Sequence, residues 1–318
     1  MTDASEKSVT PVETQAGQVG DSGQKKRQWV QHPLMRLLYF FVLFALFTLI
    51  LRLPLPTMEP GPDGQPTQTE NSIGMIPVLI AVVLAYYLTV RIAEKRPVTE
   101  LTRGAVVGAV VGLVVGAVLF SVIVGFIWIL GGISFDGTGY PEDWPNVLVQ
   151  IAVFAGIFEE IVTRGVLFRL AEELIGSWGA VILSGALFGL AHAGNTNATL
   201  LSVVSIAASA GLLFPIVYML TRNLWICIGI HVAWNAVQGI VYGIPVSGNE
   251  SSGLLVTHAT GPELISGGAF GVEASIIVPI VLIIVSVILG RQARKTGNVV
   301  APYWRRGATF GTAARLRA

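Results

Sequence analysis

Residues 154–168 read FAGIFEEIVTRGVLF, a run that is apolar enough to lie in lipid although it contains Glu159, Glu160 and Arg164. On insertion scales, each charge costs at least ~2.5 kcal/mol to hold in hydrocarbon. Three charges within six residues therefore need a reason, and the rest of the chain has to supply it.

The composition of the chain is that of a membrane protein. It has 318 residues, of which 53% are hydrophobic and 12% are charged, whereas a soluble domain carries about 25% charged residues. The mean hydropathy is +0.70. The net charge of +1 gives no reason to expect a nucleic-acid partner. Cys227 is the single cysteine, which excludes an internal disulfide and a cysteine-based zinc cluster.

Eight apolar runs are long enough to cross a bilayer, since a helix needs about 20 apolar residues to cross ~30 Å of hydrocarbon. They lie near residues 34–53, 74–93, 104–131, 147–170, 178–198, 200–221, 223–246 and 274–291. The sequence thus predicts an all-α fold, a polytopic helical bundle of about eight transmembrane helices that is integral to the cell membrane and surrounded by the lipid bilayer.

Basic residues predict the orientation of these spans. Lys and Arg concentrate in loops that stay in the cytoplasm, and the loops on one side of the predicted bundle hold nearly all of them. On the opposite side, the loops contain acidic residues and a single basic residue, Arg52. With an even number of spans, both termini are expected in the cytoplasm.

The third span contains a repeat in which Gly104, Gly108, Gly112 and Gly116 recur every four residues. Residues at this spacing share one face of a helix, and small residues there let two helix backbones approach closely. We interpret the repeat as a helix-packing face.

The spacing of the charges divides the two glutamates. Residues four apart share a helix face, whereas adjacent residues diverge by about 100°. Glu160 and Arg164 are therefore positioned to pair, and Glu159 points elsewhere without a local partner. We interpret Glu160 as a structural carboxylate kept ionised by arginine and Glu159 as a carboxylate free to transfer protons.

Three further polar residues interrupt later spans: His192 in the fifth, and His231 with Asn235 four residues on in the seventh. A rise of ~1.5 Å per residue puts both histidines and Glu159 nearer the middle of the bilayer than its surfaces. Singly, a histidine can serve as a helix–helix hydrogen-bond partner, and the Glu160–Arg164 pair can be a structural ion pair. Together they exceed what packing requires, and we expect a buried polar site.

Three motifs carry a resemblance to a known family. Glu159-Glu160-x-x-x-Arg164, Phe188-x-x-x-His192 and His231-x-x-x-Asn235 resemble, in this order, the signature of the CPBP intramembrane proteases. That family groups CAAX prenyl endopeptidases with bacteriocin-processing and immunity (Abi) proteins. The resemblance covers residues 145–245, about a third of the chain. The stretch GPELISGGAFGVEAS at 261–275 also resembles segments of bacterial members.

The resemblance implies a role for each motif residue. Glu159 is implied to be the general base that activates a water, and His192 to help hold that water. His231 and Asn235 are implied to donate hydrogen bonds to the developing oxyanion, as electrostatic stabilisation requires.

The same resemblance assigns Glu160 and Arg164 to orienting and bracing the site. The implied function is an intramembrane endopeptidase of the CAAX type, a hydrolase that cleaves a peptide bond of a membrane-associated peptide or protein.

A metal cofactor is left open, although the family is commonly labelled a metalloprotease. Glu159, His192 and His231 could form a three-ligand zinc site with an open position for water. The chain lacks an H-E-x-x-H motif, however, and the same residues can act as a metal-free glutamate–histidine water activator. We favour the mechanism without a tightly bound metal; a divalent metal such as zinc is the alternative.

Two other functions compete with proteolysis. Intramembrane Glu and His residues also serve proton relays, which would suit a proton-coupled transporter. A non-catalytic bacteriocin self-immunity or scaffold protein could keep the same core. Replacing Glu159 by Gln discriminates, because it would alter uptake in a transporter, abolish cleavage in a protease and change nothing in a scaffold.

The chain is expected to have four parts. Residues 1–30 are polar and predict a disordered cytoplasmic tail. Residues 34–145 hold spans one to three and a proline-rich external loop, 145–291 form the protease-like catalytic membrane domain, and 292–318 form a basic cytoplasmic tail.

Overall fold

A computed structural model describes residues 31–54 and 67–306. The predicted N-terminal tail, most of the proline-rich loop and the end of the C-terminal tail lie outside these residues, and the four-part division of the chain stays a prediction. The elements are, in chain order, α2 (Pro33–Arg52), α3 (Gln68–Leu88), the π-helix η1 (Thr89–Ala93), α4 (Thr99–Thr102), α5 (Ala105–Ile129), β1 (Ile133–Thr138), α6 (Trp144–Asn146), the π-helix η2 (Val147–Phe154), α7 (Ala155–Glu160), the π-helix η3 (Ile161–Phe168), α8 (Arg169–Ala191), α9 (Leu200–Ala208), α10 (Ala210–Thr221), α11 (Leu224–Ala236), the π-helix η4 (Val237–Val241), β2 (Leu255–Ala259), α12 (Glu263–Ser266), the short 3₁₀ helices η5 (Gly268–Phe270) and η6 (Val272–Ala274), α13 (Ile277–Lys295) and α14 (Tyr303–Arg306).

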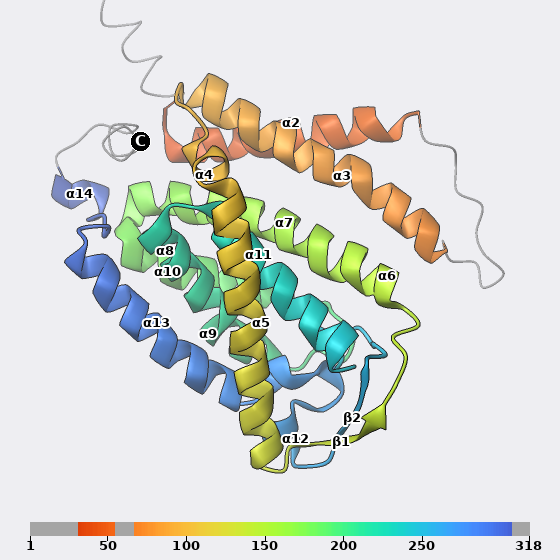
Figure 1. The fold of residues 1–318 in the computed structure, drawn as a ribbon. Helices are drawn as coiled ribbons and strands as arrows, with labels where there is room; N and C mark the ends of the chain where they lie inside the picture. The colour runs from red at the N-terminus through yellow and green to blue at the C-terminus, as the bar shows by residue number, and fades with distance from the viewer. Residues whose placement is uncertain (1–30, 55–66, 307–318) are drawn as a thin grey trace, which may run out of the picture.

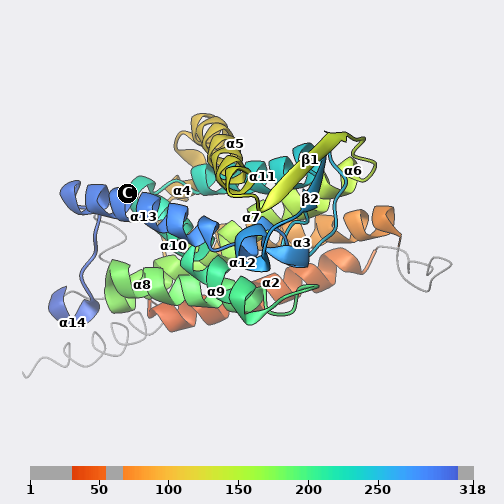
Figure 2. The same ribbon diagram turned by 90° about the horizontal axis from the view of Figure 1, so that it is seen from below.

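The described chain forms a bundle of apolar helices, as the sequence predicts (Figure 1). The helices α2 and α3 pack together along one edge, and α13 packs against α10 (Figures 1 and 2). The strands β1 and β2 pair antiparallel and lie with α12 at one end of the bundle, whereas α4 and α14 lie at the other. This two-stranded sheet is the one departure from an all-α fold in the described residues.

Seven helices in the described ranges are long and apolar enough to cross a membrane. One of them, Trp144–Ala191, has 48 residues and would be about 70 Å long if straight, more than twice the hydrocarbon thickness. Gly176 interrupts it with φ 76° and ψ 170°, a conformation that L side chains rarely adopt. The count of about eight treats this bent helix as two spans, the predicted fourth and fifth.

The segment with the three opening charges is less regular than the sequence predicts. In place of a continuous α-helix over 147–170, the π-helices η2 and η3 flank the six-residue α7. Each π-turn widens the helix by one residue and is often found at functional sites. The irregularity lies directly around Glu159 and Glu160.

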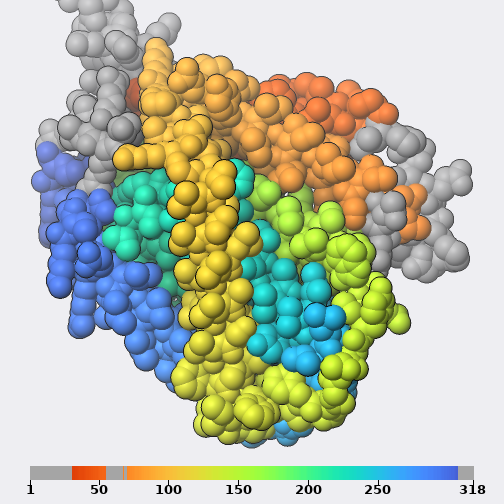
Figure 3. Space-filling view, in the orientation of Figure 1, coloured from red at the N-terminus to blue at the C-terminus, as the bar shows by residue number. Residues whose placement is uncertain are grey.

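The glycine repeat packs α5 against α11, as predicted. Figure 3 shows α5 as a ridge that runs across one face of the molecule. A Cβ added to Gly112 would lie 2.4 Å from the carbonyl oxygen of Ile226, and one added to Gly116 would lie 2.4 Å from that of Ile230. Because α11 carries His231 and Asn235, this contact fixes one wall of the predicted site.

Eight charged residues gather at the end of the bundle where α2 begins and α13 ends. We call this group the end cluster: Arg36, Glu94, Arg96, Glu100, Arg169, Glu172, Glu173 and Arg222. From the sequence, these arginines are interpreted as markers of cytoplasmic loops. The structure shows that they are also paired with carboxylates, and the orientation of the spans stays a prediction.

Every carboxylate of the end cluster has an arginine partner. Glu94 lies 2.8 Å from Arg96 and 2.7 Å from Arg169. Glu100 is 2.7 Å from Arg96. Glu172 is 2.5 Å from Arg222, and Glu173 pairs with Arg36.

These pairs determine the charge state of the carboxylates that lie outside the spans. Burial by itself raises the pKa of Glu100, but the hydrogen bonds and charge of Arg96 lower it further, and the pKa falls to about 2. Burial likewise opposes ionisation of Glu94, yet the charges of Arg169 and Arg96 lower its pKa below the ordinary value. The arginines therefore hold Glu94 and Glu100 in their ionised form.

Candidate active site

All six predicted site residues lie in the described part of the chain. Glu159 and Glu160 are on α7, Arg164 is on η3, and His231 and Asn235 are on α11. These elements pack directly on one another.

His192 lies where α8 ends, whereas the sequence predicts it within the fifth span. It is the residue that caps the C-terminus of α8, and Gly194 and Asn195 follow in a turn. The predicted fifth span is therefore too long at this end, because residues that favour turns follow the apolar run.

Glu160 joins the first and third motifs. Its side chain is fully buried, and its Oε1 accepts hydrogen bonds from Nη1 of Arg164 at 3.0 Å and from Nδ1 of His231 at 3.0 Å. The structure thus contains the predicted Glu160–Arg164 pair. It also shows a partner that spacing does not reveal, since Glu160 orients a histidine 71 residues away.

Arg164 is held between two aromatic rings. Its guanidinium carbon lies 4.4 Å from the ring centre of Phe188 and 4.9 Å from that of Phe214. Nη1 donates to Thr163 Oγ1 at 2.7 Å, and Nη2 donates to the carbonyl oxygen of Ala210 at 3.2 Å. Desolvated contacts between a cation and a ring contribute about 2 kcal/mol each, so Phe188 has a bracing role in the second motif.

The hydrogen bonds of both histidines fix which ring nitrogen faces the site. His192 Nδ1 lies 2.8 Å from the carbonyl oxygen of Phe188, which can only accept, so Nδ1 carries the hydrogen. His231 Nδ1 donates to Glu160 by the same reasoning. A neutral ring then leaves Nε2 as an acceptor, the arrangement that holds a water or a metal ion.

This geometry sharpens the predicted role of His231. With Nδ1–H bonded to Glu160, Nε2 can donate to an oxyanion only when the ring is an imidazolium. Glu160 supplies the negative charge that would balance such a cation. The ring of Phe214, stacked on His231 with centroids 5.4 Å apart, holds the imidazole in place.

The side chain of Asn235 is held by a hydrogen bond from its amide nitrogen. Its Nδ2 donates to the carbonyl oxygen of Ile151 at 2.8 Å. An amide has two N–H donors, so this bond fixes the side chain and leaves its second hydrogen for another acceptor.

Glu159 differs from Glu160 in burial and in its lack of an arginine partner, as the helical spacing predicts. It is half-buried, and no arginine or lysine of the described residues forms an ion pair with it. Its Oε2 is buried, and no described residue donates a hydrogen bond to it. Glu159 lies on α7, which packs against α11, the helix that carries His231.

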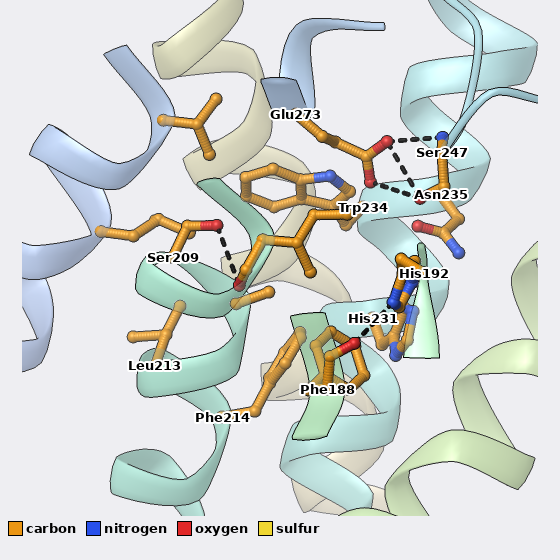
Figure 4. A pocket seen from close by; sticks show the side chains of 14 residues that line it. Phe188, His192, Ser209, Leu213, Phe214, His231, Trp234, Asn235, Ser247 and Glu273 are labelled. Atoms are coloured by element: carbon orange, nitrogen blue, oxygen red, sulfur yellow. Dashed lines mark hydrogen bonds between the residues drawn. The ribbon is translucent and has the colours of Figure 1, made fainter. Parts of the chain in front are cut away.

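A cavity of ≈ 30 Å³ lies beside the histidines (Figure 4), with room for about one water molecule. His192, His231 and Asn235 line it together with an apolar wall. Several lining residues are not predicted from the sequence, above all Phe214, Trp234, Ser247 and Glu273.

Glu273 lies between the predicted seventh and eighth spans, and this connecting segment folds back and brings its carboxylate to the cavity (Figure 4). Glu273 Oε2 accepts hydrogen bonds from the Ser247 backbone nitrogen at 2.5 Å and from Gln238 Nε2 at 3.2 Å. Burial raises the pKa of Glu273, and these hydrogen bonds offset only part of the effect. The one signal in the sequence was its position in the 261–275 stretch that resembles bacterial family members.

The predicted metal ligands are not arranged as a metal site. Among the described residues, no group of three or more His, Cys, Asp or Glu side chains lies close enough to hold a metal ion. Glu159, His192 and His231 therefore do not form a three-ligand zinc set in this arrangement.

Comparisons with known proteins agree with the motifs. Residues 141–237 match the family described as type II CAAX prenyl endopeptidase Rce1-like. The chain is also 26% identical over 126 residues to the "Putative membrane peptidase YdiL" of Bacillus subtilis (strain 168). This alignment covers 40% of the chain and 47%, about half, of that relative. No solved structure matches. The matched segment contains all three motifs in their order, and within it this bundle of membrane-spanning helices is similar to the CAAX-type membrane proteases of the CPBP family.

Proposed function

We propose that this protein is an intramembrane endopeptidase that hydrolyses a peptide bond of a membrane-associated peptide or protein. The observation that carries the proposal is the difference between two adjacent carboxylates. Glu160 is fully buried and bonded to Arg164 and His231, whereas Glu159 has no cation partner among the described residues and a buried oxygen without a donor. A carboxylate in that position is suited to accept a proton.

The reaction follows from these positions. Glu159 takes a proton from a water that His192 Nε2 helps to hold, and the water oxygen attacks the peptide carbonyl carbon. The oxyanion that forms accepts hydrogen bonds from the second amide hydrogen of Asn235 and from His231 as imidazolium. The carbon–nitrogen bond then breaks, and the leaving nitrogen receives the proton that Glu159 had taken.

Glu160 and Arg164 take no part in bond making in this mechanism. Glu160 holds His231 by its Nδ1, and Arg164 holds Glu160 while two phenyl rings enclose its guanidinium. Such support keeps reacting groups within the narrow range of geometry that catalysis needs.

We derive no step through a metal ion, because the donor set is not gathered as ligands. The two mechanisms differ in what purified protein contains. Stoichiometric zinc in the wild type that is lost in the His192→Ala/His231→Ala variant would contradict the metal-free mechanism and establish a metal-dependent one.

The experiment that tests proteolysis compares protein termini in membranes of cells that carry the wild type, Glu159→Gln or Glu250→Gln. Glu250 is an exposed carboxylate on the β2 side of the bundle and serves as the matched control. We expect new termini with the wild type and Glu250→Gln that are absent with Glu159→Gln, and their sequences identify the substrate. Identical termini in all three samples at equal expression would support the immunity or scaffold function instead.

A further inference from the structure

A groove opens on the surface between α5 and α11, and it shares no lining residue with the cavity of the candidate active site. Its volume is ≈ 240 Å³, whereas one water needs about 10–15 Å³ by the same measure. Residues in the first two turns of the two helices, or just before them, line it, among them Arg103, Val107, Val111, Thr221, Asn223 and Ile226. The groove is therefore large enough for a group of many atoms.

The glycine repeat shows why the two helices separate at this end. An added Cβ at Gly112 or Gly116 would lie 2.4 Å from a carbonyl oxygen of α11, so the two backbones are in contact there. An added Cβ at Gly104 would still lie 3.8 Å from Asn223 Nδ2. The helices thus diverge toward Gly104, and a residue without a side chain leaves the space between them open.

The groove changes from charged to apolar along α5. Arg103 and Asn223 each lie just before a helix that is long and apolar enough to span the membrane. Val107 and Val111 follow Arg103 by four and eight residues, about 6 and 12 Å along the helix axis. Their side chains are 70% and 44% exposed. The charged end of the groove therefore lies at the membrane boundary, and the apolar end lies at the depth of the lipid chains.

Trp225 supports this placement of the boundary. Its indole Nε1 donates a hydrogen bond to the carbonyl oxygen of Leu101 at 2.7 Å, which joins α11 to α4. Tryptophan is enriched at the headgroup level of membranes. The open end of the groove is accordingly at the level of the lipid phosphates.

Arg103 brings a positive charge to this end that no carboxylate in the described chain balances. Its side chain is exposed, and its printed hydrogen bonds come from its backbone, whose carbonyl oxygen accepts from Asn223 Nδ2 at 3.1 Å. The other arginine on the groove, Arg222, is already paired with Glu172 at 2.5 Å. None of the residues that line the groove is acidic. The groove is thus complementary to an anion.

We propose that this groove binds an anionic phospholipid, with the phosphate on Arg103 and the start of an acyl chain along Val107, Val111 and Ile226. A guanidinium group binds phosphate through two parallel charge-assisted hydrogen bonds, and basic pockets between membrane helices bind anionic headgroups. A zwitterionic lipid fits less well, because the groove offers no carboxylate to its ammonium group. This inference does not depend on the proposed endopeptidase activity.

The first test measures lipid binding by the full-length protein in a nonionic detergent. Native mass spectrometry follows titrations with phosphatidylglycerol and with phosphatidylcholine of the same acyl chains. We expect the wild type to bind the first phosphatidylglycerol about fivefold more tightly than phosphatidylcholine, and Arg103→Gln to lose this preference. Arg91→Gln is the matched control, because Arg91 is exposed but does not line the groove, and it should bind both lipids like the wild type.

A second pair of variants tests the apolar end. Val111→Trp fills the groove and should weaken phosphatidylglycerol binding. Val114→Trp should not, since Val114 is 58% exposed on the same helix and does not line the groove. Thermal unfolding without added lipid checks that both variants are folded. Unchanged binding in a folded Val111→Trp would contradict the placement of the acyl chain.

Three further results would overturn the inference. The first is equal affinity of the wild type for the two lipids. The second is a preference for phosphatidylglycerol that Arg103→Gln retains. The third is displacement of phosphatidylglycerol by an equal concentration of inorganic phosphate, because the site would then recognise a free anion and not a lipid.

Discussion

Two groups of buried charge lie in this bundle, and they are organised in opposite ways. In the end cluster, four arginines face four glutamates, and each carboxylate lies on at least one guanidinium. In the candidate active site, Arg164 forms an ion pair with Glu160. The carboxylates of Glu159 and Glu273 have no arginine or lysine partner in the described chain.

The difference separates charged residues that stabilise the fold from charged residues that are available for a reaction or a ligand. A buried ion pair is costly to break because the remaining partner is left uncompensated. An unpaired carboxylate already bears that cost, and its retention points to a reaction or a ligand. The predictions below test this division, from the largest expected effect to the smallest.

Exchanging one carboxylate from each group should give opposite results. Glu159→Gln should lower the cleavage rate about a thousandfold, because a general base contributes about 10²–10⁴-fold, without lowering the free energy of unfolding. Glu94→Gln leaves Arg169 without its carboxylate and Arg96 with Glu100 alone, and should lower stability while folded molecules keep their activity. Cleavage assays and chemical denaturation of both variants check this; an active, fully stable Glu94→Gln would break the comparison.

Arg164→Met should destabilise the protein by about 3–5 kcal/mol, because it strips a fully buried Glu160 of its guanidinium. Arg91→Met is the control, since Arg91 is exposed and surface changes usually stay within about 0.5 kcal/mol. Urea unfolding in detergent measures both. Equal stability of the two variants would show that the aromatic enclosure, and not the ion pair, holds this region.

Acid should weaken the end cluster. The pKa of Glu100 is about 2 in the fold against an ordinary 4.5, so its stabilisation is present above pH 4.5 and is lost as the pH falls toward 2. The loss is at most about 3 kcal/mol. Unfolding free energies measured from pH 5 to pH 3 should fall steeply in the wild type and less steeply in Glu100→Gln. The same slope in both proteins would assign the acid sensitivity to other groups.

Gly112→Val should cost about 2 kcal/mol, because its side chain would collide with the Ile226 carbonyl 2.4 Å from the added Cβ. Gly125→Val is the matched control on the same helix, where an added Cβ meets nothing within 4 Å. Thermal unfolding and cleavage by each variant are compared. If α5 only covers lipid-facing surface, the two variants will have the same Tm.

Local spacing was enough to predict a good part of the site. The i, i+4 separation of Glu160 and Arg164 predicted their pair, because a helical turn brings those positions together even where the helix widens to a π-turn. Apolar length predicted the spans. It also made the fifth span too long at His192, since hydropathy does not register a capping turn.

Contacts between distant segments could not be predicted in this way. Glu160 and His231 are 71 residues apart, and Arg36 and Glu173 are 137 apart. Their pairing depends on which helices pack together. Glu273 shows the same limit, because an acidic residue in a loop reads as solvent-exposed until the loop is seen to fold into the bundle.

The sequence by itself determined that the chain is a helical membrane protein, and it located the three motifs and distinguished Glu159 from Glu160, because hydropathy and helical periodicity are local properties. Only the tertiary structure decided that Glu160 orients His231, that the arginines at one end are buried in pairs, and that Glu273 reaches the cavity. These facts depend on helix packing, in which each buried charge takes its partner from whichever segment lies beside it.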